Sequence, residues 1–188
     1  VSLLVKAGKL SLDTLLGDVI PAVLKTPKAK ISIDMLLRHT SGLPAHREFF
    51  RSIIKEPQRS REVLRNLIVK EPLESEPGLE QVYSDLGYMF LSWVVETLSG
   101  QRLDRFVREK IYEPLGIRDL FFIDLDNETW VKEPLKKDRL VSTQTCPWRR
   151  RTLVGEVDDD NAWAAGGIEG HAGLFGDAPS IHILCCEI

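Results

Sequence analysis

The sequence has little of what marks membrane-spanning, disulfide-rich or nucleic-acid-binding proteins. None of its apolar runs approaches the roughly 20 residues that a membrane-spanning helix needs. Its three cysteines, of which Cys185 and Cys186 are adjacent, do not make a disulfide framework. The net charge is −3 with both signs mixed, so the charge gives no reason to expect a nucleic-acid partner. The basic cluster Arg149–Arg151 is typical of a solvated turn.

Signals for a metal, a cofactor or secretion are equally scarce. Asp158–Asp160 lack the glycine and the terminal glutamate of an EF-hand loop, and no histidine lies at ligand spacing. We therefore expect a solvated acidic loop there, and neither a metal nor a cofactor. Val1–Lys6 lacks the basic flank and the cleavage pattern of a signal peptide, which leaves the compartment open. What is present, with 43% apolar and 28% charged residues, is an ordinary globular composition.

Hydrophobic periodicity predicts helices over most of the first part of the chain. Residues 45–56 and 60–70 each carry an apolar face at helical spacing, and Pro57 separates the two. A shorter helix is expected to begin after Ser32, whose side chain can cap it. The expected apolar faces of the two longer helices consist of Phe49, Phe50, Ile53, Ile54, Val63, Leu64, Leu67 and Ile68.

Strand-like sequence appears only later. Leu120–Ile123 and Thr152–Val157 are the candidates, among loops rich in aspartate and proline. We therefore predict a mainly helical chain that forms a single partial domain over residues 1–188. Within it, 1–118 are expected to be mainly helical, and 119–188 to hold loops, short strands and a truncated terminal helix.

The most informative stretch is Pro77–Tyr88, which an apolar run of helical spacing follows. Its opening Pro-Gly pair is typical of a turn, and Ser84 or Asp85 can cap the helix behind it. This places Tyr83 on the loop just before a helix N-terminus. A phenol beside that positive dipole end, with a lysine nearby, is suited to act as a general base.

This stretch resembles the serine β-lactamase-related superfamily, which holds class C β-lactamases, penicillin-binding D,D-peptidases and related esterases. The middle motif of that group, Tyr-x-Asn, is matched by Tyr83–Asp85. The resemblance covers nearly the whole chain in the right order. Its other segments are Leu36–Pro44, Ile111–Ile117 and Gly166–Phe175.

The resemblance implies a parent fold of the α/β class, in which a helical domain is paired with a sheet domain built from both ends of the chain. Because this sequence matches the middle, we expect a fragment that lacks most of the sheet. The implied activity is hydrolysis of an ester, amide or β-lactam through an acyl-enzyme. A Ser-x-x-Lys motif supplies the nucleophile, the motif tyrosine assists proton transfer, and a Lys-Thr-Gly or His-x-Gly strand completes the oxyanion site.

Of these three elements we expect only Tyr83, as acid/base, to be present. The Ser-x-x-Lys match at Ser52–Lys55 lies after the segment that it should precede, so we interpret it as coincidence. His171 fits His-x-Gly but follows Tyr83 too closely, so it is either a substrate-binding residue or part of a glycine-rich structural loop. The chain alone is expected to be inactive, with the nucleophile encoded upstream of Val1.

Asp85 departs from the resemblance, because asparagine usually occupies that position. An ionised carboxylate only accepts hydrogen bonds, so it cannot donate to a substrate carbonyl as an amide can. Asp85 is therefore either a member of the catalytic motif or a helix cap without substrate contact. This departure keeps a second hypothesis open, namely a catalytically inactive remnant or binding module of the same fold. His39, on a turn before Ser41, is interpreted as a structural histidine.

The resemblance also bears on partners. It implies a small-molecule or peptidoglycan-like substrate in the parent protein, and relatives often act in the periplasm or cell envelope. We expect no nucleic-acid partner and no membrane span. The substrate, the oligomeric state and the compartment remain open.

Overall fold

The computed structural model describes residues 1–57, 59–127 and 140–187. The chain divides into two compact units, each made of two separate segments. Unit 1 comprises Val1–Arg47 and Arg65–Phe106, and unit 2 comprises Glu48–Leu64 and Val107–Ile188. Helices predominate over strands among the described residues, as the periodicity predicted. None of the described helices has the length and apolar character that a membrane crossing requires.

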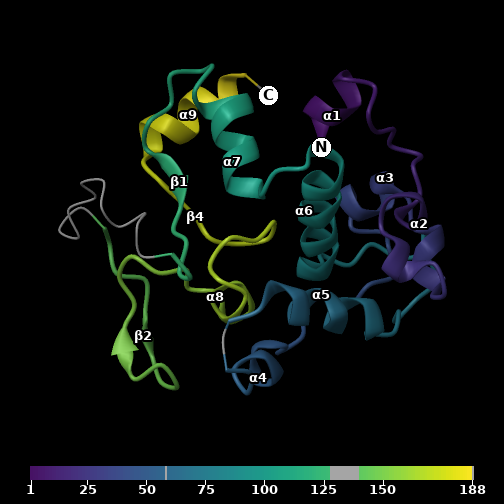
Figure 1. Ribbon diagram of the computed structural model, residues 1–188, viewed down its shortest axis with the longest axis horizontal. Helices are drawn as coiled ribbons and strands as arrows, with labels where there is room; N and C mark the ends of the chain where they lie inside the picture. The colour runs from purple at the N-terminus through teal and green to yellow at the C-terminus, as the bar shows by residue number, and fades with distance from the viewer. Residues whose placement is uncertain (58, 128–139, 188) are drawn as a thin grey trace. The chain divides into compact units, whose positions relative to one another are not determined.

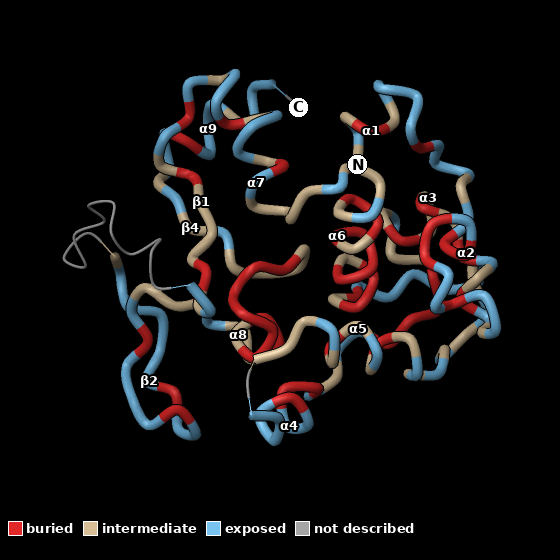
Figure 2. Tube along the Cα trace, in the orientation of Figure 1, coloured by how far each residue is buried: buried red, intermediate tan, exposed pale blue. Residues whose placement is uncertain are grey.

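Unit 1 is built around α6 (Asp85–Ser99), the longest described helix, which buries Leu86, Phe90 and Val94 completely. Figure 2 shows buried residues along most of this helix. Three short helices pack against α6 (Figure 1). They are α1 (Ser2–Lys6), α2 (Leu16–Val19) and α3 (Ile33–Leu37), and the 3₁₀ turns η1 (Pro21–Val23) and η2 (Pro27–Lys30) connect the last two.

The ends of α6 and α3 follow capping chemistry. Ser84 is the N-cap of α6, and its hydroxyl accepts the Gly87 N–H at 3.3 Å. At the other end Gly100 takes the left-handed conformation, with φ +69°, that commonly ends a helix. Ser32 caps α3 by accepting the Met35 N–H at 3.2 Å. The predicted caps and the predicted stop are confirmed.

Unit 2 combines short helices with two small antiparallel strand pairs. β1 (Leu120–Phe122) pairs with β4 (Leu174–Gly176), and β2 (Thr145–Cys146) pairs with β3 (Arg151–Thr152). α4 (Phe50–Ile53) packs against α8 (Asp160–Ala164), where the buried Asn161 amide oxygen accepts the Phe50 N–H at 2.8 Å. The other helical elements of unit 2 are the π turn η3 (Arg108–Tyr112) and α9 (Ala178–Cys186). Helices α5 (Arg61–Lys70) and α7 (Leu103–Val107) each have residues in both units, with the larger part in unit 1.

The helix predicted at 45–56 is wrong in its extent, because only the single turn α4 forms. Ile53 is fully buried, whereas Ile54, expected on the same face, is 46% exposed. Ile54 follows the last residue of α4, so the helical periodicity that would have turned it inward ends before it. The helix predicted at 60–70 is confirmed as α5, which buries Leu64 and Ile68.

The strand predictions were right for β1 and incomplete elsewhere. The strand expected at Thr152–Val157 is reduced to the end of β3, since Gly155 turns the chain with φ +70°. β4 lies in a glycine-rich stretch that was interpreted as a loop, and only its pairing with β1 makes it a strand. The division of the chain at residue 118 stays a prediction, and 128–139 lie outside the described residues.

The solvated turn predicted at Arg149–Arg151 is wrong for Arg149. Its side chain is 1% exposed, and its guanidinium donates to the carbonyls of Val157 and Asp158, each at 2.9 Å. It also pairs with the Asp160 carboxylate at 2.5 Å. The guanidinium carbon lies 5.1 Å and 4.9 Å from the ring centroids of Trp148 and Trp163. A buried cation is retained here because carboxylate, carbonyls and rings replace its water.

The carboxylate of Glu156 belongs to the same cluster, and we expect its ionisation to contribute to the stability of unit 2. Burial acts to raise its pKa, but hydrogen bonds from Arg151 and Trp163 and the charge of Arg149 outweigh it, so the pKa lies below the ordinary 4.5. A carboxyl group with a lowered folded-state pKa stabilises the fold above its unfolded pKa. That stabilisation is lost as pH falls through the lowered value.

We therefore expect Glu156→Gln to flatten the loss of stability in acid. Urea unfolding between neutral pH and pH values below 4.5 should show a smaller fall in the free energy of unfolding for the variant than for the unchanged chain. Glu113→Gln is the matched control, because Glu113 is 55% exposed in its pair with Arg108, and exposed pairs contribute little. Equal acid sensitivity of the unchanged chain and Glu156→Gln would contradict this assignment.

Candidate functional site

Tyr83 lies on the segment that leads into α6, with its residue surface 72% exposed. The residues on either side of it are bound to one partner. This partner is His39. The Val82 N–H donates to the backbone carbonyl of His39 at 2.9 Å, and the Ser84 N–H donates to Nδ1 of the His39 imidazole at 3.1 Å. The predicted position, on a loop just before a helix N-terminus, is confirmed. An exposed phenol on a doubly anchored segment is available to a ligand and limited in its motion.

The imidazole of His39 also contacts aromatic rings. Its centroid lies 4.6 Å from that of Tyr83 at an interplanar angle of 35°, and 5.1 Å from that of Tyr88 at 19°. Tyr88 comes from the first turn of α6, one helical turn after the N-cap. The interpretation of His39 as a structural histidine is therefore confirmed, since its ring and its backbone are both engaged.

The loop that follows His39 is tied to the start of α6. The Ser84 hydroxyl, 1% exposed as a residue, donates to the Pro44 carbonyl at 2.6 Å. The Asp85 N–H donates to the Ala45 carbonyl at 2.9 Å. These bonds satisfy polar groups at the helix start that would otherwise be buried without partners. They also hold the next residue, His46, beside the helix N-terminus.

His46 explains how Asp85 is accommodated. Its Nδ1 lies 3.1 Å from Asp85 Oδ2, with the two side chains 47% and 23% exposed. Asp85 is the first residue of α6, where a negative charge also suits the helix dipole. The N-cap itself is Ser84, whereas Asp85 occupies the first turn, and whether Asp85 contacts a substrate stays a prediction. His46 was missed from the sequence, since it lies just outside the matched segment that ends at Pro44.

Ser52 and Lys55 have none of the geometry of a nucleophile and its base. Both are exposed, and Ser52 belongs to the single turn α4 in unit 2. The hydrogen bond between the two residues is a backbone one, from the Lys55 N–H to the Ser52 carbonyl at 3.2 Å. In the described part of the chain no hydrogen bond joins their side chains. This agrees with the interpretation of the Ser-x-x-Lys match as a coincidence of sequence.

His171 is also a residue of unit 2, and its side chain is only 3% exposed. Its Nε2 lies 3.0 Å from Asp159 Oδ1, and the same carboxylate caps α8 by accepting the Ala162 N–H at 2.7 Å. This contact ties the glycine-rich loop to the start of α8 and favours the structural alternative. A direct role in substrate binding stays a prediction.

The acidic residues at 158–160 are not a solvated loop, which corrects the prediction. Asp159 caps α8, Asp160 pairs with Arg149, and Asp158 accepts the Thr143 hydroxyl at 3.0 Å. Two of the three therefore serve helix α8 or the buried arginine. Only Asp158 remains fully on the surface.

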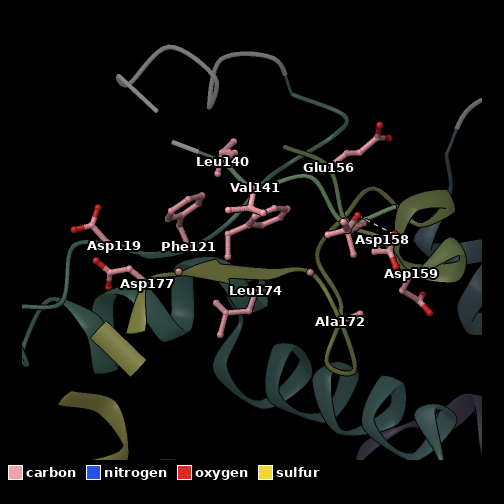
Figure 3. A pocket seen from close by; sticks show the side chains of 15 residues that line it. Asp119, Phe121, Leu140, Val141, Glu156, Asp158, Asp159, Ala172, Leu174 and Asp177 are labelled. Carbon is pink, nitrogen blue, oxygen red and sulfur yellow. Dashed lines mark hydrogen bonds between the residues drawn. The ribbon is translucent and has the colours of Figure 1, made fainter. Parts of the chain in front are cut away.

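A pocket of about 420 Å³ lies within unit 2, between β1, β4 and the segments around 140–143 and 156–159. Figure 3 shows Asp119 and Asp177 at one end of it and Asp158 at the other, with Phe121 and Val141 between them. Apolar walls with acidic ends suit an uncharged or basic group. None of the residues that line it belongs to Tyr83–Asp85.

Comparison with known proteins decides the family. The family model described as Beta-lactamase matches residues 1–185 of this chain. The chain belongs to the beta-lactamase family. A relative from Salmonella paratyphi A, named "Putative D-alanyl-D-alanine carboxypeptidase", is 32% identical over 195 residues, which cover 96% of this chain and 45% of that protein. The chain thus spans a little under half the length of the relatives of this kind that it matches.

Solved structures support the same fold for this member of the beta-lactamase family. A penicillin-binding protein from Bacillus halodurans is similar with a TM-score of 0.68 at 22% identity, over 98% of this chain and 54% of that one. A mutant class C beta-lactamase is similar with a TM-score of 0.66 at 15% identity, over 97% and 44%. The predicted fold class, a mainly helical portion of a β-lactamase-like α/β fold, is confirmed.

Proposed function

We propose that this chain is part of a serine hydrolase that cleaves an ester, amide or β-lactam through an acyl-enzyme. The nucleophile comes from a Ser-x-x-Lys motif outside residues 1–188, in the longer protein to which we expect the chain to belong, called here the parent protein. Tyr83 transfers the proton between the nucleophile and the leaving group. Membership of the beta-lactamase family supports the reaction class.

One observation carries this proposal. Tyr83 combines high exposure with a fixed backbone, because both neighbouring N–H groups bind His39. A general acid or base must reach the substrate and must hold its position while the proton moves. The two hydrogen bonds limit the backbone on either side of Tyr83, and its exposed phenol remains accessible to a substrate.

The proposed substrate class is supported by the Salmonella relative, which is named "Putative D-alanyl-D-alanine carboxypeptidase". We propose peptides that end in D-alanyl-D-alanine, which occur in peptidoglycan, as substrates of the parent protein. The likeness to a hydrolase with promiscuous acyltransferase activity concerns the fold alone.

The second candidate is a catalytically inactive remnant or binding module of the same fold. The observation in its favour is Asp85, whose Oδ2 lies 3.1 Å from His46 Nδ1 and whose ionised carboxylate cannot donate to a substrate carbonyl. The two candidates differ in one measurable property, because only the hydrolase forms a covalent acyl-enzyme.

Covalent labelling tests the proposal. The parent protein and the isolated chain are each incubated with a fluorophosphonate probe or a penicillin, digested, and mapped by mass spectrometry. We expect one adduct on the parent protein, at a serine outside residues 1–188, and none on the isolated chain. A parent protein that stays unlabelled would favour the inactive remnant. An adduct on Ser52 would overturn the interpretation of that motif.

A further inference from the structure

We propose that His39 is a positioning residue for Tyr83, and that it acts as a neutral imidazole protonated at Nε2. The proposal rests on the acid/base role of Tyr83 proposed above and adds the residue that holds the phenol in place. His39 is not itself offered as a proton donor or acceptor to the substrate.

The hydrogen bonds define the form of the imidazole. A backbone N–H can only donate, so the bond from Ser84 at 3.1 Å requires a lone pair on Nδ1 of His39. The ring proton is therefore on Nε2. Together with the bond from the Val82 N–H to the His39 carbonyl, this bond brackets Tyr83 from both sides. Between the two hydrogen-bonded residues, Val82 and Ser84, only Tyr83 has a backbone N–H outside this pair of hydrogen bonds to His39.

The ring contact restricts the side chain as well. Aromatic rings whose centroids lie about 4.5–7 Å apart attract each other in offset and tilted arrangements. The 4.6 Å contact between His39 and Tyr83 falls within this range, although the phenol is largely in solvent. Tyr88 contacts the same imidazole from the rigid first turn of α6. Through the imidazole of His39, the side chain of Tyr83 is therefore linked to helix α6 as well as to its own loop.

Few residue types can meet all the demands of this position. The backbone of residue 39 has φ +59°, which histidine, asparagine and aspartate adopt more readily than other non-glycine residues. An acceptor at the place of Nδ1 is needed for the Ser84 N–H, and a flat ring is needed for the contact with Tyr83. Histidine supplies the conformation, the acceptor and the ring together.

Two substitutions separate these contributions. His39→Asn keeps a side-chain acceptor and tolerates the positive φ but removes the ring, whereas His39→Phe keeps a ring and removes the acceptor. His182→Asn is the matched control, because His182 is an exposed histidine on α9 in unit 2. All three can be made in the isolated chain and in the parent protein.

The first readout is the tautomer, measured on the isolated chain by long-range ¹H–¹⁵N NMR at about pH 8, where histidines are ordinarily neutral. We expect His39 to show an unprotonated Nδ1 and a nuclear Overhauser contact with the Tyr83 ring. In both His39 variants the ring signals of Tyr83 should move, and in His182→Asn they should stay. A His39 protonated at Nδ1, or Tyr83 signals unmoved by both variants, would overturn the proposal.

The second readout is the turnover of the parent protein. A phenol displaced by even about 1 Å can cost on the order of a hundredfold in rate. We expect kcat to fall at least about tenfold in His39→Asn and His39→Phe, with KM little changed and less loss in the variant whose Tyr83 signals move less. Unchanged kcat in both, while Tyr83→Phe is impaired, would refute the positioning role. If Tyr83→Phe itself retains full kcat, the proposed function of Tyr83 is wrong, whatever the tautomer of His39.

Discussion

Replacing Tyr83 with phenylalanine in the parent protein is expected to lower kcat by about 10²–10⁴-fold, the usual contribution of a general acid–base group. Only the phenolic oxygen is removed, and the ring contact with His39 can be retained. The residue is 72% exposed, so the free energy of unfolding should be unchanged. Steady-state hydrolysis of an activated ester and urea unfolding of the same preparations measure the two quantities.

Tyr112→Phe is the matched control for this change. Tyr112 belongs to the small buried cluster of unit 2 with Ile117 and Leu120, and burial raises the pKa of its phenol. Its replacement removes a tyrosine hydroxyl from a place without a proposed role in turnover, so kcat should stay the same. A Tyr83→Phe enzyme as active as the control would show that the phenol takes no part in proton transfer.

Replacing Gly42 with alanine is expected to cause the largest loss of stability in unit 1. Gly42 has φ +73°, and a Cβ there would lie 2.2 Å from the carbonyl oxygen of Ser75. The left-handed conformation costs a non-glycine residue about 1–2 kcal/mol, and overpacking adds about 1–3 kcal/mol. We therefore expect urea unfolding to show a loss of about 2–5 kcal/mol, the sum of these two contributions.

Gly100→Ala separates the two contributions to that loss. Gly100 has nearly the same φ, +69°, but a Cβ there would meet no atom within 4 Å. This variant should lose only the conformational part, about 1–2 kcal/mol. Equal losses in the two variants would show that the chain at Ser75 gives way to the new methyl group. The turn between His39 and Pro44 would then be able to accommodate a methyl group at residue 42.

The parts of the fold that were predicted from sequence are those with local signals. Helix α6 has a capping serine, helical periodicity and a terminal glycine, and each acts within a few residues of its own position. The same holds for α3 after Ser32 and for the placement of Tyr83 before α6. Because these signals agree with one another, neither distant contacts nor packing were needed to interpret them.

The parts that were missed depend on contacts between residues far apart in the sequence. β4 is a strand only because β1, more than fifty residues earlier, pairs with it. Arg149 was assigned to solvent because a run of three arginines gives no sign of the carbonyls and tryptophans that enclose one of them. His46 gained its significance only when the loop after Pro44 was found bound to the start of α6.

For the site, the sequence identified the tyrosine and the structure supplied what surrounds it. The motif placed Tyr83 and Asp85 two residues apart, but it could not say that each has its own histidine. His39 holds the segment around Tyr83, and His46 accompanies Asp85. These histidine partners can be identified only from the folded structure. The number of residues between each histidine and the motif depends on the turns of the intervening loop, and no helical or strand periodicity predicts it.

The acid/base role of Tyr83 is tested by the rate at which a fluorescent penicillin acylates the parent protein. This rate is measured in stopped flow for the unchanged protein, Tyr83→Phe and Ser52→Ala. We expect Ser52→Ala to be acylated at the unchanged rate and Tyr83→Phe to be acylated about a hundredfold more slowly, or slower still. Normal acylation in Tyr83→Phe together with none in Ser52→Ala would contradict this expectation, because the chain would then supply the nucleophile and not the acid/base group.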